Sequence, residues 1–98
     1  MISALRRWAE KALQADIRLL KVGFFGSYAR GDWGVGSDLD VIIIVAETDL
    51  PFERRAIEWD LTELPVPVDL LVYTPSEWER LIRQAGFGKR LEREVTWV

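Results

Sequence analysis

The sequence contains no cysteine and no histidine, and both absences narrow its chemistry. Without cysteine the chain has no disulfide bonds and no thiolate metal sites. Without histidine it has no Ser-His-Asp or Cys-His catalysis and no imidazole ligand for zinc. Any metal must be held by oxygen atoms, which favours magnesium, manganese or calcium, and the best candidate for a general base is a carboxylate.

Long apolar runs and clusters of basic residues are also missing. The longest apolar run, Val41–Ala46, is far too short to span a bilayer, and the N-terminus lacks the apolar core of a signal peptide. A cytoplasmic protein without a membrane partner is therefore expected. The net charge is −3 and the basic residues are dispersed, which argues against direct binding of duplex nucleic acid. A length of 98 residues predicts one globular domain, residues 1–98.

The hydrophobic pattern predicts an α+β (α/β sandwich) fold, a mixed sheet of about four strands with helices packed on it. The expected elements are a helix over 2–15, strands over 17–25 and 39–46, a helix over 51–64, a strand over 68–73, a helix over 75–85 and a short strand over 95–98. The strands over 39–46 and 68–73 should pair in parallel, because the helix over 51–64 connects them. The loop between the strands over 17–25 and 39–46 is short for such a crossover, so these two strands should be antiparallel. Thr74 and Glu77 form a capping box. The inner residues expected for the helix over 51–64 are Phe52, Ala56, Ile57 and Trp59. The charged stretch 88–95 is interpreted as a solvated face.

Three aspartates are expected to meet at one edge of this sheet. Asp38 and Asp40 lie two residues apart at the start of an apolar strand, so their side chains share a face with Cα atoms roughly 6.6 Å apart. Asp69 begins the next strand, whose parallel pairing brings it to the same edge. The antiparallel first strand ends there too, and delivers Gly26 and Ser27.

Simpler interpretations exist for each aspartate. Asp38 alone is typical of a turn or cap residue. Asp40 lies inside an apolar strand and needs a cation or several donors, so a structural salt bridge with Arg30 is the alternative to a metal. Asp69 lies between two apolar residues and, like Asp40, needs a cation or several hydrogen-bond donors. Three such residues at one edge favour a metal site. Trp33, in the glycine loop, is open to three uses: stacking on a base, contact with a partner protein, or anchoring the loop.

The stretch "GSYARGDWGVGSDLD", Gly26–Asp40, resembles the signature of the DNA polymerase β-type nucleotidyltransferases. That signature is a Gly-Ser turn, an Arg-Gly pair, and Ser-Asp-x-Asp entering a strand. The short chain and the third acidic strand, "PVDLLVY", resemble the minimal nucleotidyltransferases of bacteria and archaea. The resemblance implies that Gly26 and Ser27 hold the β- and γ-phosphates of a nucleoside triphosphate. It also implies that Arg30 stabilises the loop or the phosphates and that Ser37 belongs to the nucleotide-binding set.

The same resemblance implies that Asp38 and Asp40 bind two Mg²⁺ ions, with Mn²⁺ as an alternative, and that Asp69 completes the catalytic site. The expected enzyme transfers AMP from ATP to a hydroxyl, a tyrosine of a HEPN-domain partner, as the antitoxin of a toxin–antitoxin pair. The main alternative is a non-catalytic antitoxin that neutralises its partner by binding. Transfer to a small molecule and homo-oligomer formation also remain open. Three mutually repelling acids have no use in a pure binder, which favours the enzyme.

Overall fold

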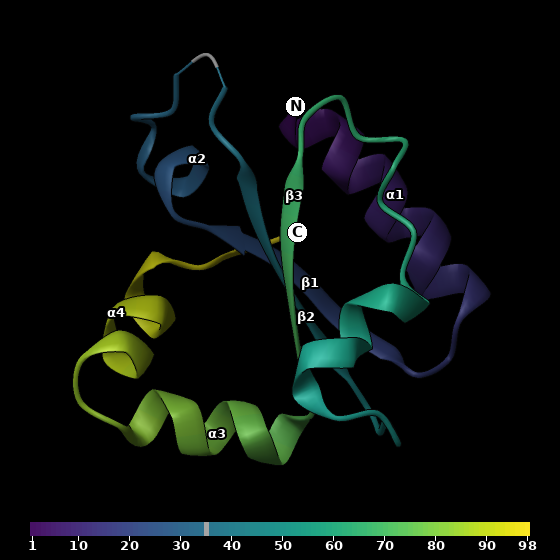
Figure 1. Ribbon diagram of the computed structural model, residues 1–98, viewed down its shortest axis with the longest axis vertical. Helices are drawn as coiled ribbons and strands as arrows, with labels where there is room; N and C mark the ends of the chain where they lie inside the picture. The colour runs from purple at the N-terminus through teal and green to yellow at the C-terminus, as the bar shows by residue number, and fades with distance from the viewer. Residues whose placement is uncertain (35) are drawn as a thin grey trace.

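The computed structural model describes residues 1–34 and 36–98, and a mixed four-stranded sheet forms its centre (Figure 1). The strands are β1 (Leu19–Phe25), β2 (Leu39–Val45), β3 (Val68–Tyr73) and β4 (Thr96–Trp97), in the spatial order β3-β2-β1-β4. β2 and β3 run parallel, whereas β1 is antiparallel to both β2 and β4. The predicted mixed sheet and its strand directions are confirmed.

Helices pack on both faces of this sheet (Figure 1). They are α1 (Ile2–Ala15), α2 (Ser27–Arg30), the 3-10 helix η1 (Phe52–Glu58), α3 (Pro75–Arg83) and α4 (Phe87–Glu94). α1 packs its buried Leu5 and Trp8 into the core on one face. On the other face, Trp78 of α3 contacts Tyr73 of β3 and Trp97 of β4, with ring centroids 6.3 and 5.5 Å away. The α+β sandwich predicted from the sequence is confirmed.

β2 is buried on both faces, which explains its almost uninterrupted run of valine and isoleucine. Val41 and Ile43 pack in the core shared with α1, and Ile42, which points to the opposite face, is also fully buried. Asp40 is the one polar residue of the strand and is half-buried. A carboxylate inside the central strand needs a reason beyond folding, because an unpaired buried charge is costly.

β1 begins two residues later than predicted. Ile17 is 94% exposed and lies in the turn after α1. Arg18 closes this turn by donating its backbone N–H to Asp16 Oδ1 at 2.9 Å and pairing its guanidinium with the same carboxylate at 3.0 Å. The local ion pair therefore ends the helix and sets the start of the strand at Leu19.

The helix predicted over residues 51–64 is wrong in length, and of its four expected inner residues Ala56 and Trp59 are partly buried whereas Phe52 and Ile57 are exposed. The helical turns are of the 3-10 type and end at Glu58, after which residues 59–67 are irregular, with turns and bends at 62–66. Phe52 and Ile57, expected inside, are 43% and 76% exposed. The side chain that is buried is Arg55, at 8% exposure.

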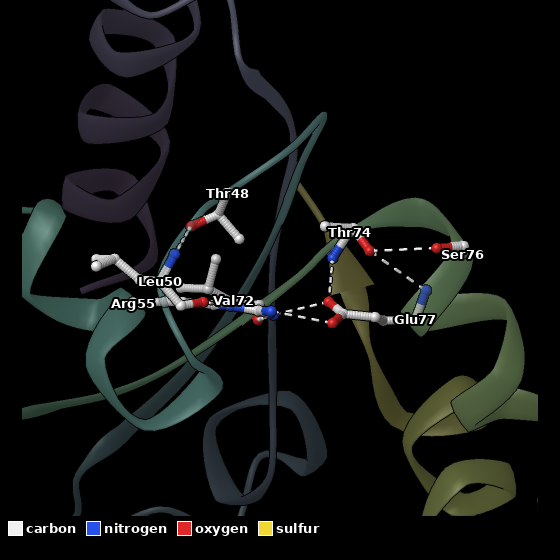
Figure 2. Close-up of polar contacts among 7 residues, drawn as sticks. All are labelled: Thr48, Leu50, Arg55, Val72, Thr74, Ser76 and Glu77. Carbon is white, nitrogen blue, oxygen red and sulfur yellow. Dashed lines mark hydrogen bonds and ion pairs between the residues drawn. The ribbon is translucent and has the colours of Figure 1, made fainter.

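Arg55 joins η1 to β3 and α3, as Figure 2 shows. Its Nε donates to the Leu50 carbonyl at 3.0 Å, and a terminal nitrogen donates to the Val72 carbonyl at 3.1 Å. Its two terminal nitrogens also donate to the Glu77 carboxylate, at 2.7 and 3.0 Å. This pairing with Arg55 lowers the pKa of Glu77 to about 2. Glu77 accepts the Thr74 N–H as well, at 2.9 Å, so the predicted capping box is confirmed.

The charged stretch near the C-terminus forms α4 rather than only a solvated face, because its Leu91 is buried. Gly86, with a φ of +79°, lets the chain reverse between α3 and α4. Gly88 then packs directly on the Leu81 carbonyl, where an added Cβ would overlap the oxygen. In the described parts of the chain, no helix has both the length and the apolar character needed to cross a bilayer.

Candidate active site

The three aspartates meet at one end of the central parallel pair. Asp40 is the second residue of β2 and Asp69 the second of β3, and the two are direct partners in the parallel register. Direct partners in neighbouring strands point to the same face of the sheet. Asp38 precedes Asp40 by two residues, and both Asp38 and Asp69 act electrostatically on the Asp40 carboxyl. The predicted register of Asp40 and Asp69 is confirmed, and Asp38 lies just before β2 at the same end of the sheet.

The Gly-Ser turn lies on the other side of Asp40, at the end of β1. Phe25 pairs with Asp40 across the antiparallel β1–β2 ladder, and Gly26 follows at once with a φ of +74°. A Cβ on Gly26 would overlap the Oδ2 atom of Asp40, so backbone and carboxylate are in direct contact. The chain then enters α2, whose first residue is the half-buried Ser27. Asp40 is thus flanked by the glycine turn on one strand and by Asp69 on the other.

The electrostatics of Asp40 disfavour its charged form. Burial raises the pKa of this carboxyl, and the charges of Asp69 and Asp38 raise it further, against a lowering effect from Arg30. Arg30 is not the structural partner considered as an alternative to a metal, because it pairs with Asp32 at 3.3 Å and Glu94 at 3.5 Å. Among residues 1–34 and 36–98, no ion pair joins a basic side chain to Asp38, Asp40 or Asp69.

The donor set fits a hard divalent cation. Three carboxylates offer only oxygen ligands, the type that magnesium prefers. A cation would also relieve the repulsion that Asp38 and Asp69 exert on Asp40. As the side chains are placed, no group of three acids in the described residues is close enough to enclose an ion. Asp38 and Asp69 are both exposed, and holding one ion together with Asp40 would require their side chains to adopt other positions.

The loop after α2 is held by its own contacts. The Ser37 hydroxyl accepts the Gly34 N–H at 2.9 Å, and the Ser37 N–H donates to the Gly34 carbonyl at 3.0 Å. Trp33 stacks on Tyr28 of α2, with ring centroids 5.3 Å apart and planes 7° from parallel, while remaining 55% exposed. In this arrangement Ser37 closes the loop and Trp33 anchors it to the short helix.

A cavity of about 510 Å³ lies beside β3, the edge strand. It is lined chiefly by apolar side chains of η1, of the turns over 59–67 and of β3, including Trp59, Leu61, Leu64 and Val66. Asp69 is its acidic lining residue. The helix predicted over 51–64 left no place for this cavity, because one of its walls is the non-helical segment after Glu58. Pro65 and Pro67 agree with a helix that ends at Leu64, so they gave no sign that the helical turns stop at Glu58.

Comparison with known proteins identifies the family. Residues 6–92 match the family model of the nucleotidyltransferase domain. A Methanocaldococcus jannaschii protein named "Putative protein adenylyltransferase" is 35% identical over 66 residues, which make up 67% of this chain and 66% of the relative. The chain thus spans just under two thirds of that relative's length.

Two crystal structures share the fold. A "putative nucleotidyltransferase" from Sulfolobus solfataricus has a TM-score of 0.63 and 24% identity, over 82% of this chain and 72% of the other. A toxin–antitoxin structure with AMP-PNP has a TM-score of 0.57 and 18% identity, over 97% of this chain and 69% of the other. Because both identities are low, these similarities support the fold, and the family model carries the assignment. With that model matching most of its length, the chain belongs to the nucleotidyltransferase domain family.

Proposed function

We propose that this nucleotidyltransferase is a magnesium-dependent protein adenylyltransferase, a single minimal domain that moves AMP from ATP onto a hydroxyl of a partner protein. The observation that carries the proposal is the position of Asp40, which contacts the Gly26 turn on one side and is paired with Asp69 on the other. A phosphate-binding turn and a set of acids side by side are what nucleotidyl transfer requires.

The acids would hold the metal. Asp38, Asp40 and Asp69 offer the oxygen ligands for two Mg²⁺ or Mn²⁺ ions, which supply positive charge to the phosphate oxygens when bound. Gly26 and Ser27 would receive the β- and γ-phosphates, and the contact between Gly26 and Asp40 places that turn beside the acids. Arg30, held by Asp32 and Glu94, would add positive charge near the phosphates, and Ser37 would keep the loop in shape for them.

Transfer would follow an in-line displacement at the α-phosphorus. The acceptor oxygen forms a bond to phosphorus, the bond from phosphorus to the bridging oxygen of pyrophosphate breaks, and the pyrophosphate leaves. The acceptor's proton passes to the Asp69 carboxylate. Most of the rate acceleration would come from positioning and charge neutralisation, as is general for reactions at phosphorus.

A tyrosine of a HEPN-domain protein is the proposed acceptor, which would make this cytoplasmic chain the antitoxin of a toxin–antitoxin pair. Two comparisons support a protein partner: one relative is named as a putative protein adenylyltransferase, and one structure of the same fold is a toxin–antitoxin with AMP-PNP.

Incubation with α-labelled ATP, Mg²⁺ and the product of the neighbouring gene tests the proposal. We expect label on the partner with the wild-type chain and none with Asp40→Asn. Asp49→Asn is a matched control, because Asp49 is exposed and lies outside this group of acids. Equal labelling by the wild type and Asp40→Asn would refute the metal assignment. Silencing of the partner without any label would favour the alternative, a non-catalytic antitoxin.

A further inference from the structure

The ladder between β1 and β4 brings the end of α4 to the Gly26 turn. Phe24 of β1 pairs with Thr96 of β4, and the two strands are antiparallel. The chain reaches Gly26 two residues after Phe24, and Glu94, the last residue of α4, lies two residues before Thr96. In an antiparallel pair these two positions are at the same end of the ladder. The turn proposed to bind phosphate and the end of α4 are therefore neighbours.

Asp40 and α4 are on the same face of the sheet. Val41 and Ile43 of β2 pack in the core shared with α1, so Asp40, which alternates with them, points to the opposite face. Leu91 of α4 is buried but lies outside that core, on the face where α3 also packs (Figure 1). The end of α4 therefore borders the face to which the Asp40 carboxylate is directed.

Glu94 contacts Arg30, the basic residue whose charge acts on Asp40. The Arg30 Nη1 atom donates to both carboxylate oxygens of Glu94 at 3.5 Å, and its Nε donates to Asp32 at 3.3 Å. The third guanidinium nitrogen, Nη2, remains for another acceptor, since no hydrogen bond within residues 1–34 and 36–98 uses it. The charge of Arg30 lowers the pKa of Asp40 against the effect of burial, so the guanidinium lies close to the acids.

Of the two carboxylates that hold Arg30, Glu94 is the one fixed by distant packing. Asp32 belongs to the same loop as Arg30 and its side chain is 61% exposed, whereas that of Glu94 is 24% exposed. α4 is held by the burial of Leu91 and by the contact of Gly88 with the backbone of α3. A long arginine side chain at the surface has many rotamers, and ordering it when a ligand binds costs free energy. A carboxylate on a fixed helix restricts these rotamers before the ligand arrives.

We propose that Glu94 is a positioning residue of the nucleotide site, which holds the Arg30 guanidinium so that its Nη2 atom can bind the polyphosphate of a nucleoside triphosphate. This inference rests on the proposed function and adds the end of α4 to the site. The same carboxylate also reduces the positive potential that attracts phosphate, so orientation and charge have opposite effects on affinity. The direction in which the affinity changes when Glu94 is removed therefore distinguishes the two effects.

Titration calorimetry of the whole chain with ATP and Mg²⁺, without partner, measures this affinity. We expect Glu94→Ala to weaken ATP binding about fivefold, because the ligand must then order Arg30 itself. Inorganic triphosphate with Mg²⁺ should lose affinity by the same factor, since Arg30 is proposed to contact only phosphate. Glu92→Ala is the matched control: it removes a carboxylate from the same helix, one that pairs with Lys89 at 3.7 Å. That variant should bind ATP within about twofold of the wild type. Unchanged or tighter binding by Glu94→Ala would overturn the inference, because the carboxylate would then only compete with phosphate for Arg30.

A double-mutant cycle with Arg30→Ala separates positioning from a general effect on the fold. In the Arg30→Ala background, Glu94→Ala should change the affinity for ATP by less than about twofold, because the side chain that it positions is gone. An equal loss of affinity in both backgrounds would show that Glu94 acts through the fold, and would overturn the inference.

These binding measurements do not depend on transfer to a partner. If ATP binding depends on Glu94 through Arg30 while no label reaches any partner, the positioning role is supported and the proposed function fails. If Glu94→Ala binds ATP like the wild type while label still reaches the partner, the proposed function holds and the positioning role is wrong.

Discussion

Gly26 and Asp40 are packed so closely that a methyl group on Gly26 would overlap the Asp40 carboxylate oxygen. The contact arises because Phe25 and Asp40 are paired across β1 and β2, and the chain turns sharply at Gly26 with a φ of +74°. Glycine is needed here for two separate reasons, a backbone conformation that other residues rarely adopt and the absence of a side chain. The phosphate turn and the central acid of the proposed site therefore depend on one another.

Gly26→Ala should lower both stability and transfer. The positive φ and the overlap with Asp40 together should cost about 1–3 kcal/mol of unfolding free energy, measured by urea denaturation. Displacement of the carboxylate should also reduce AMP transfer at least tenfold. Gly31→Ala is the control: its φ is +80°, but an added Cβ would meet nothing within 4 Å. That variant should lose about 1–2 kcal/mol from its backbone conformation and keep its activity. Equal loss of activity in both variants would contradict the role of the contact.

Asp40→Asn should stabilise the metal-free chain while abolishing transfer. Burial and the charges of Asp69 and Asp38 raise the pKa of Asp40, so its carboxylate destabilises the fold at neutral pH. The amide removes that repulsion, and thermal melting without divalent ions should show a higher melting temperature. Transfer should fall about 100-fold or more.

Magnesium should reverse this order of stability. With Mg²⁺ and ATP, ligand binding to the native state should raise the melting temperature of the wild type more than that of Asp40→Asn. Treatment with EDTA should remove the difference in response. A variant that responds to Mg²⁺ and ATP like the wild type would show that Asp40 does not hold the metal.

The core and the acidic edge could be predicted because they depend on short-range patterns. The apolar run after Asp40 indicated a strand buried on both faces, and the two-residue spacing of Asp38 and Asp40 indicated a shared face. Parallel pairing of the next strand then fixed where Asp69 would lie. Each of these conclusions needs only local periodicity and one topological rule.

Arg55 and the cavity could not be predicted, because both depend on contacts between distant segments. Arg55 is separated by 22 residues from Glu77, its ion-pair partner, and nothing near it in the sequence marks it as buried. The expected inner residues Phe52, Ala56 and Trp59 are spaced for one face of an α-helix, and that spacing does not apply to a 3-10 segment with three residues per turn. The cavity in turn exists only because the chain leaves the helix at Glu58.

Gly88→Ala should be destabilising, against the usual trend for a glycine in a helix. Alanine normally favours a helix by about 1 kcal/mol over glycine. Here the added Cβ would overlap the Leu81 carbonyl oxygen, which belongs to the backbone of α3 and has little room to move. We expect a net loss of about 1–3 kcal/mol in urea denaturation. Gly34→Ala, where nothing lies within 4 Å of the added atom, should change the unfolding free energy by less than about 0.5 kcal/mol. A neutral or stabilised Gly88→Ala would show that the two helices can separate at no cost.

The ion pair between Arg55 and Glu77 should make the fold sensitive to acid. The pKa of Glu77 is about 2 in the folded chain against 4.5 as its ordinary value, because Arg55 stabilises the carboxylate. The unfolded chain therefore takes up a proton at a higher pH than the folded chain. The stabilisation is complete above about pH 4.5 and decreases as the pH falls toward 2. Since Glu77 is 29% exposed, its share at pH 7 should be about 1–3 kcal/mol.

Glu77→Gln isolates this contribution. Its unfolding free energy should be lower than that of the wild type at pH 7, and the difference should shrink between pH 4.5 and 2 as the wild-type carboxylate becomes protonated. Glu79→Gln on the same helix is the control, because Glu79 is exposed and its contact with Arg83 spans 3.9 Å. Surface pairs of this kind contribute little, so that variant should follow the wild-type curve at every pH. If Glu77→Gln lost the same stability at pH 2.5 as at pH 7, the amide would be disturbing the packing around Arg55, and the carboxylate charge would not be the cause.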